Sequence, residues 1–176
     1  LNLFKNAINL PTQRFVKRLT KQTSLPPLAD TIDSLGLSSS SSSTSLRAPT
    51  SIAKHSWLAL LCNGWLSALN DLRQCAIQSV AKKCAIVLSE SILIIAQTFK
   101  QVAEQRHFEA KEADQFTDMC LTFGEHLMTF VAQCFDNIYR SKRPLIDLSI
   151  AKKTLIGLYS VQLKSEESNT SSSLQS

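Results

Sequence analysis

The chain has 176 residues, of which 44% are hydrophobic, with only 4 Gly and 5 Pro. It is long enough for one domain with a sizeable core, and its few turn-forming residues disfavour an all-β fold. The net charge is +5, but residues 55–140 carry seven basic and nine acidic residues, so the basic excess lies in the flanks and no nucleic-acid partner is expected.

Residues 1–22 are predicted to be helical, because their apolar residues recur at three-to-four spacing. These residues are Leu3, Phe4, Ile8, Phe15, Val16 and Leu19. Pro11 is expected to break this helix or to begin a second one, since its ring removes a hydrogen bond inside a helix. Because the sequence begins at Leu1 instead of Met, we expect the segment to be the end of an upstream helical region.

Basic residues cluster on the remaining face of this first segment: Arg14, Lys17, Arg18 and Lys21. A solvated face is the favoured interpretation, and contact with acidic lipid or an acidic partner is the alternative. Residues 23–50 are predicted to be a flexible linker, because prolines and a serine run from Ser38 to Ser43 leave little apolar surface to bury. The Ser-rich end, residues 164–176, is predicted to be a disordered tail.

Residues 51–163 are predicted to form a helical bundle, with Thr50 or Ser51 as the first N-cap. Three long apolar patterns with steps of three and four follow, and a polar turn at residues 107–111 separates the second from the third. They run through Trp57, Leu58, Leu61, Trp65, Leu69 and Leu72; through Ile77, Ala81, Cys84, Leu88, Ile95, Phe99 and Val102; and through Phe116, Cys120, Phe123, Leu127, Val131, Cys134 and Ile138. A shorter helix is expected within residues 145–163, with Ile146, Ile150 and Leu158 at helical spacing. The fold class is therefore predicted to be all-α, an elongated antiparallel helical bundle.

Catalytic and metal-binding patterns are missing from the sequence. The five cysteines form no CxxC pair and are expected to be buried free thiols in a reducing compartment. No GxSxG, HExxH, EF-hand or glycine-rich phosphate loop occurs, and a cluster of acidic residues from Glu109 to Asp118 is accounted for by the dipole at a helix start. We therefore expect no enzyme activity, no cofactor, no metal and no small-molecule substrate. The longest uncharged run, residues 55–70, is too short to span a membrane.

One polar stretch stands out within the first long apolar pattern. It places Asn63, Asn70, Asp71 and Arg73 beside the apolar Leu69 and Leu72. We expect the two leucines to pack inward while the polar residues hydrogen-bond to a neighbouring helix or to a partner subunit. Two hypotheses are equally supported: the polar residues fix the register of helices within this domain, or they contact a partner protein.

Residues from about Trp57 to Tyr139 resemble the C-terminal part of the family of subunit 8 of the conserved oligomeric Golgi complex. The resemblance rests on WLALLCNGWLSALNDLRQCA, in which Asn63, Asn70, Asp71, Leu72, Arg73 and Cys75 follow the family pattern in order. It continues through ILIIAQTFKQVAEQRHF and FTDMCLTFGEHLMTFVAQCF, where Phe116, Cys120 and Phe123 occupy family positions.

This resemblance implies a rod-like helical subunit of a vesicle-tethering complex, without enzyme activity or cofactor. It further implies a peripheral location on the cytosolic face of the Golgi membrane and a role in retrograde transport within the Golgi. The implied partners are other subunits of the complex, subunit 1 and those of the second lobe among them. Two alternatives remain: a helical scaffold of another elongated complex, or a membrane-surface module using residues 1–22 and 145–163.

Overall fold

The computed structural model describes residues 1–22, 24–28 and 47–158. Most of the predicted linker, the predicted tail and the end of the predicted bundle up to residue 163 lie outside these residues. The described part contains helices and no strand, which confirms the all-α prediction. In chain order the elements are α1 (Asn2–Lys21), α2 (Thr50–Ala53), α3 (Ser56–Gln74), η1 (Gln78–Val80), α4 (Ala81–Gln105), α5 (Ala110–Leu121), η2 (Thr122–Leu127) and α6 (Met128–Ile138). Residues 149–158 form a further helical segment.

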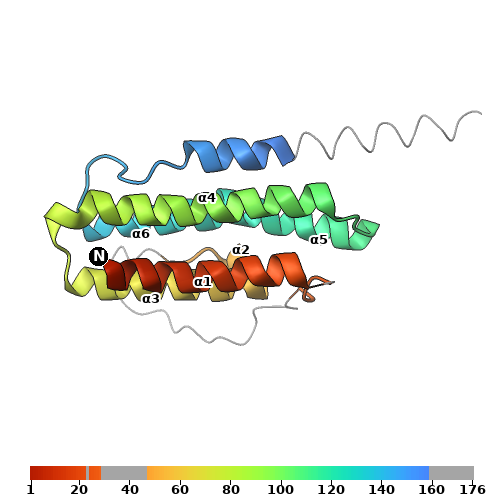
Figure 1. Cartoon of the computed structure of the whole chain (residues 1–176), viewed down its shortest axis with the longest axis horizontal. Helices are drawn as coiled ribbons and strands as arrows, with labels where there is room; N and C mark the ends of the chain where they lie inside the picture. The colour runs from red at the N-terminus through yellow and green to blue at the C-terminus, as the bar shows by residue number, and fades with distance from the viewer. Residues whose placement is uncertain (23, 29–46, 159–176) are drawn as a thin grey trace, which may run out of the picture.

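The long helices lie side by side along one axis and form an elongated antiparallel bundle (Figure 1). Helix α1 packs against both α3 and α4, and α3 also packs against α6. Each long helix runs opposite to the one before it in the chain, so α1 and α4 point the same way. The core therefore lies between α1, α3, α4 and the rod formed by α5, η2 and α6. The basic N-terminal segment belongs to this core through Phe4, Ile8, Phe15 and Leu19, which are all buried.

Helix α1 is continuous through Pro11, so the expected break is wrong. The proline ring packs against Gly64 of α3, where no side chain stands between the two backbones. Next to it, the indole N–H of Trp65 donates a hydrogen bond of 3.1 Å to Thr12 Oγ1, and the Thr12 hydroxyl donates to the Ile8 carbonyl at 2.8 Å. Burial of α1 against two helices thus outweighs the hydrogen bond that proline cannot make.

Sequence spacing predicted most of the core but misplaced some positions. Leu3, Ile77 and Ile150 were assigned to apolar stripes, yet they are exposed. Ile77 lies in the connection before η1, and the α-helical register of α4 begins only at Ala81. Each misplaced residue stands at or near the beginning of a helix, where a three-to-four spacing does not yet guarantee a neighbour to pack against.

The third apolar pattern forms one helical rod, with a π-helical turn, η2, between α5 and α6. Gly124 lies inside this turn, where its low helix propensity weakens the α-helical arrangement. The predicted core residues Phe116, Cys120, Phe123 and Leu127 are buried nonetheless. A π turn inserts one residue into a helix, and steps of three and four do not distinguish it from regular helix.

The beginning of α3 differs from the prediction, because neither Thr50 nor Ser51 caps a helix with its side chain. They belong to the short helix α2, the chain then bends, and α3 begins after His55. The buried His55 ring places Nε2 2.9 Å from Oδ2 of the exposed Asp118 on α5. Burial lowers the pKa of His55 below its usual 6.5, and Asp118 partly opposes this shift.

The His55–Asp118 pair predicts that the folded chain loses stability at acid pH. Because the pKa of His55 is lower in the folded chain, the unfolded chain binds a proton to His55 more readily. The contribution of the neutral ring to the free energy of unfolding is therefore fully present above pH 6.5, and it is lost as the pH falls toward the lowered pKa of the folded chain. Asp118→Asn should make the fall in Tm steeper over this window, because the opposing charge is lost. Melting followed by circular dichroism measures it, with the exposed Asp114→Asn as control. Equal pH profiles for the two variants would contradict the assignment.

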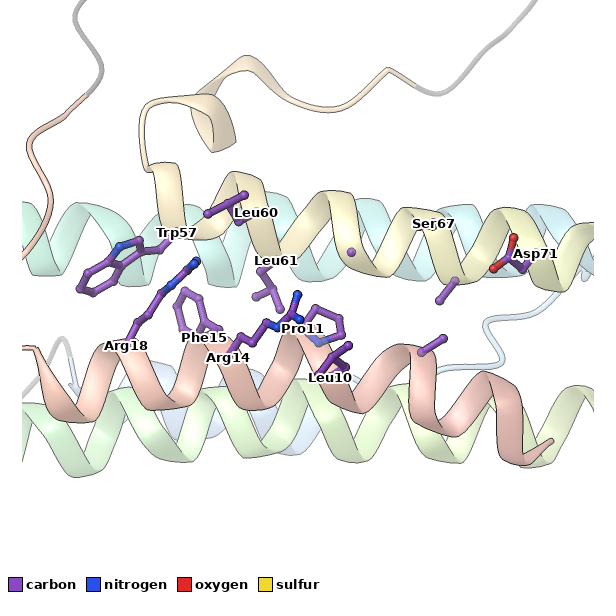
Figure 2. Close-up of a pocket in the computed structure, with 13 residues that line it drawn as sticks. Leu10, Pro11, Arg14, Phe15, Arg18, Trp57, Leu60, Leu61, Ser67 and Asp71 are labelled. Atoms are coloured by element: carbon purple, nitrogen blue, oxygen red, sulfur yellow. The ribbon is translucent and has the colours of Figure 1, made fainter.

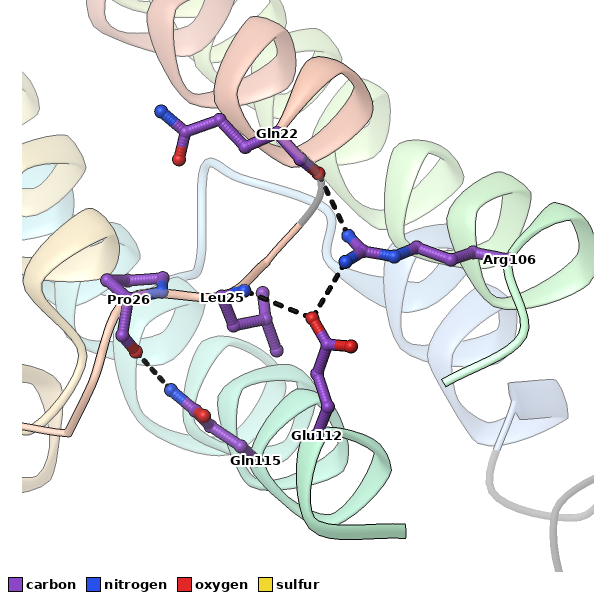
Figure 3. A network of polar contacts seen from close by, with 6 residues as sticks. All are labelled: Gln22, Leu25, Pro26, Arg106, Glu112 and Gln115. Atoms are coloured by element: carbon purple, nitrogen blue, oxygen red, sulfur yellow. Dashed lines mark hydrogen bonds and ion pairs between the residues drawn. The ribbon is translucent and has the colours of Figure 1, made fainter. Parts of the chain in front are cut away.

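A polar network closes the end of the bundle where α1 and α4 terminate (Figure 3). Arg106 donates to the Gln22 carbonyl at 3.0 Å and to Glu112 Oε1 at 2.7 Å. The same Glu112 oxygen accepts the Leu25 N–H at 3.1 Å, and Gln115 donates to the Pro26 carbonyl. The first residues of the predicted linker are thus held against α5.

Replacing Glu112 with alanine is expected to lower the free energy of unfolding by about 1–2 kcal/mol, because the half-buried network loses its shared acceptor. The matched control is Glu104→Ala, which removes an exposed carboxylate 3.8 Å from Lys100. Such a surface pair contributes less than about 0.5 kcal/mol. Urea unfolding measures the free energy of unfolding of both variants. Similar losses for the two would show that the network stabilises the fold no more than a surface ion pair does.

Candidate protein-binding surface

The singled-out polar stretch lies on α3, and its apolar and polar members separate cleanly. Leu69 and Leu72 are 3% and 9% exposed and belong to the core. Asn63, Asn70, Asp71 and Arg73 are all exposed. None of these four side chains makes a hydrogen bond or ion pair with the part of the chain that the structure describes.

The hypothesis that these polar residues fix helix register within the domain therefore has no described contact to support it. The described contacts between α1 and α3 include the Thr12–Trp65 hydrogen bond and the fit of Pro11 on Gly64. Sequence reasoning missed this pair, although a glycine within an apolar helical pattern lowers helix stability and therefore points to a packing requirement. The other hypothesis, contact with a partner, remains a prediction.

Two grooves run along α3, and three of the four polar residues are divided between them, whereas Asn63 lines neither. Asn70 and Arg73 line one groove, which lies between α3 and α6. Asp71 lines the other, which lies between α1 and α3. The division follows from helix geometry, since residues three apart share a face and successive residues point about 100° apart.

The α3–α6 groove is an open depression of about 680 Å³. Its lining residues are Ala48, Leu66, Leu69, Asn70, Arg73, Phe130, Cys134, Asn137, Ile138 and Arg140. The aliphatic and aromatic members on α3 and α6 are buried or half-buried, whereas the two amides and the two arginines are exposed. An apolar floor with a polar rim is the usual make-up of a protein-binding surface.

Charge in this groove has one sign. Arg73 on α3 and Arg140 just after α6 are the charged residues among those that line it. The nearby Asp136 does not line the groove, and its carboxylate accepts the Leu145 N–H at 2.9 Å. An acidic ligand would therefore meet two guanidinium groups and no opposing carboxylate in the lining.

Arg140 has an unusual backbone, with φ of 47°. It stands at the position after the C-cap of α6, where Ser141 N–H donates to the Asp136 carbonyl at 3.0 Å and Arg140 N–H donates to the Asn137 carbonyl at 3.3 Å. This is the Schellman pattern, in which glycine is the usual residue because it has no Cβ to strain. Sequence spacing gave no sign that Arg140 would adopt a left-handed backbone conformation.

The α1–α3 groove is smaller, at about 260 Å³ (Figure 2). Arg14 and Arg18 extend from α1 toward α3 in this view, with Arg18 beside Phe15 and Trp57 and Arg14 beside Pro11. Arg14, Lys17 and Lys21 of the predicted basic cluster are exposed, and Arg18 is half-buried. Asp71 adds a carboxylate to the rim, so the charges of this groove are mixed.

The thiols and imidazoles offer little reactive chemistry. Cys62, Cys84 and Cys120 are buried as expected, but Cys134 is only half-buried. Cys75 is exposed because it follows the last turn of α3. Burial raises the pKa of Cys62 to about 11 and that of Cys120 well above its usual value, so both thiols stay protonated at neutral pH. Within the described ranges, no three His, Cys, Asp or Glu residues gather as metal ligands would.

These features define a helical bundle whose notable surface is a pair of open grooves along α3. None of the helices in the described ranges combines the length and the apolar character needed to cross a membrane.

The chain is 32% identical over 98 residues to "Conserved oligomeric Golgi complex subunit 8" of Drosophila melanogaster. This similarity confirms the resemblance predicted from the sequence. The aligned part is 53% of this chain and 17% of the fly protein, so the chain corresponds to a small share of its relative. No family model matches the chain, and no solved structure matches it.

Proposed function

We propose that this chain is a non-enzymatic structural part of a conserved oligomeric Golgi tethering complex, and that it supports retrograde vesicle transport within the Golgi. The similarity to the fly subunit carries the proposal. In this role the chain acts at the cytosolic face of the Golgi membrane as a peripheral component. Its partners are other subunits of the complex, with subunit 1 and the second-lobe subunits as the first candidates.

The surface of α3 supports a role in binding other proteins. Its polar residues Asn70, Asp71 and Arg73 have no partner within the described chain, and two of them stand beside a groove with an apolar floor. Exposed polar side chains around half-buried apolar ones suit contacts that form between separately folded subunits.

Affinity capture of the tagged chain from cells, followed by mass spectrometry, tests this function. We expect recovery of several tethering subunits together, and fluorescence microscopy should place the chain on Golgi membranes. Asn70→Ala, Asp71→Ala and Arg73→Ala combined should reduce recovery without lowering Tm, because all three side chains are exposed. Leu69 and Leu72 are unsuitable for this purpose, since they are buried and their replacement by polar residues would unfold the domain. Capture of a folded chain without any tethering subunit would refute the proposal.

A further inference from the structure

The length and the lining of the α3–α6 groove suit the binding of one helix. On α3 its lining residues run from Leu66 to Arg73 at helical spacing, a rise of about 10 Å, and on α6 they run from Phe130 to Ile138, about 12 Å, with Arg140 just beyond the helix end. A length of two to three helical turns matches the three or four apolar anchors by which an amphipathic helix docks into a groove. No strand edge is present in the described chain, so pairing with an extended peptide is not favoured.

The rim of the groove specifies the charge of its occupant. Arg73 and Arg140 approach from the two walls, and both are exposed. Arginine binds carboxylates through paired hydrogen bonds, and charged residues at a rim select partners of opposite sign. Asn70 and Asn137, also exposed, add donors and acceptors between the arginines. The charges in the lining therefore favour an acidic occupant.

Arg140 adds a second, independent observation. It holds a left-handed backbone position that glycine fills without strain, and the helix would end in the same Schellman pattern with glycine there. The Arg140 side chain is exposed and makes no hydrogen bond or ion pair with the described part of the chain, and the hydrogen bonds of the pattern come from the backbone. A bulky residue in a strained conformation at the mouth of a groove points to contact with a ligand.

We propose that the α3–α6 groove binds an amphipathic helix of a partner protein, with an apolar stripe on the groove floor and carboxylates paired to Arg73 and Arg140. This inference rests on the proposed function, in that the partner is taken to be another subunit of the tethering complex. It adds the place of contact, the secondary structure of the partner segment and its charge.

The first experiment maps the occupant. A photo-crosslinking phenylalanine analogue replaces Asn137 in the full chain expressed in cells, and crosslinked peptides are identified by mass spectrometry. We expect one peptide from a tethering subunit, with apolar residues at three-to-four spacing and at least two carboxylates. The same analogue at the exposed Gln97 of α4 is the control and should not yield that peptide.

The second experiment tests the charge pairing with the identified peptide, synthesised and labelled for fluorescence anisotropy. Arg73→Glu combined with Arg140→Glu should weaken binding by about tenfold or more, and added salt should weaken binding to the unaltered chain. Lys17→Glu combined with Lys83→Glu makes the same change in net charge at exposed residues away from the groove and should have little effect. Exchange of the peptide carboxylates for lysines should restore binding to the Arg73→Glu, Arg140→Glu chain.

Arg140→Gly separates binding from folding. It should raise Tm by roughly 2–4 °C, because glycine adopts the left-handed backbone conformation without the strain that a Cβ causes, and it should weaken peptide binding. A higher Tm with unchanged binding would remove Arg140 from the proposal.

The outcomes distinguish the two levels of the proposal. Recovery of tethering subunits without a crosslink at residue 137, or with binding unaffected by charge reversal at Arg73 and Arg140, would overturn the groove and leave the proposed function standing. A crosslink to a basic or extended segment would also overturn it. Flotation with anionic vesicles that is lost on charge reversal would assign the arginines to a lipid surface instead. Absence of every tethering subunit would overturn the proposed function itself.

Discussion

Replacing Phe99 with alanine is expected to lower the free energy of unfolding by about 4 kcal/mol. The ring is fully buried in α4 and stands at the centre of an aromatic cluster. Its centroid lies 5.7 Å from that of Phe15, 5.7 Å from that of Phe116 and 5.4 Å from that of Phe123. Because these rings come from α1, α5 and η2, the cavity would weaken contacts between several helices at once. Urea unfolding followed by circular dichroism measures the loss.

Phe108→Ala is the matched control for this substitution. Phe108 stacks on Phe116 with centroids 4.6 Å apart, but it is half-buried and lies in the turn before α5. Its removal should cost on the order of 1–2 kcal/mol, since less apolar area leaves water on folding. An equal effect of the two substitutions would contradict the central place of Phe99 in the aromatic cluster.

The sequence predicted the long helices because their apolar faces obey one simple rule. Steps of three and four through Trp57, Leu61 and Trp65, or through Leu88, Ile95 and Phe99, require only that one helical face be buried. The rule fails where geometry depends on a distant segment. Pro11 was expected to break a helix or to begin a second one, yet its ring fits against Gly64, which lies far along the chain and has no side chain.

The candidate site was predicted only in part, for a related reason. Spacing on α3 predicted that Leu69 and Leu72 pack inward, and both are buried. The polar residues beside them were expected to hydrogen-bond to a neighbouring helix or to a partner, and in the structure they are exposed. The groove itself needs Phe130, Asn137 and Arg140, and no local pattern tells which later helix packs beside α3. The left-handed backbone of Arg140 was equally hidden, because arginine is rare in that conformation and carries no sequence signal for it.

The same packing links the first helix to the surface on α3. Pro11 and Thr12 contact the inner side of α3 at Gly64 and Trp65, whereas the α6 groove lies on another side of the same helix. A change in the α1 contact would therefore move the wall that carries Asn70 and Arg73. Stability of the bundle and the shape of the groove are then expected to depend on one close approach between two helices.

Gly64→Ala is expected to lower the free energy of unfolding by about 2 kcal/mol, although alanine is a better helix former than glycine. A Cβ at this position would lie 2.6 Å from Pro11 Cβ and 3.0 Å from Pro11 Cγ. The proline ring is rigid, so α1 and α3 would have to separate, and the packing beside Trp65 would be lost with the fit. Thermal and urea unfolding measure the effect.

Gly157→Ala provides the opposite case within the same chain. Nothing lies within 4 Å of the Cβ that it would add, so the gain in helix propensity should raise the stability by up to about 1 kcal/mol. Pro11→Gly removes the ring atoms that the new methyl group on α3 would meet, and in that background Gly64→Ala should cost far less than it does alone. The difference between the two costs is the coupling between α1 and α3, since the residues are in contact. If Gly64→Ala were as harmless as Gly157→Ala, the two helices would not approach as closely as the structure has them, and the wall of the groove would not depend on α1.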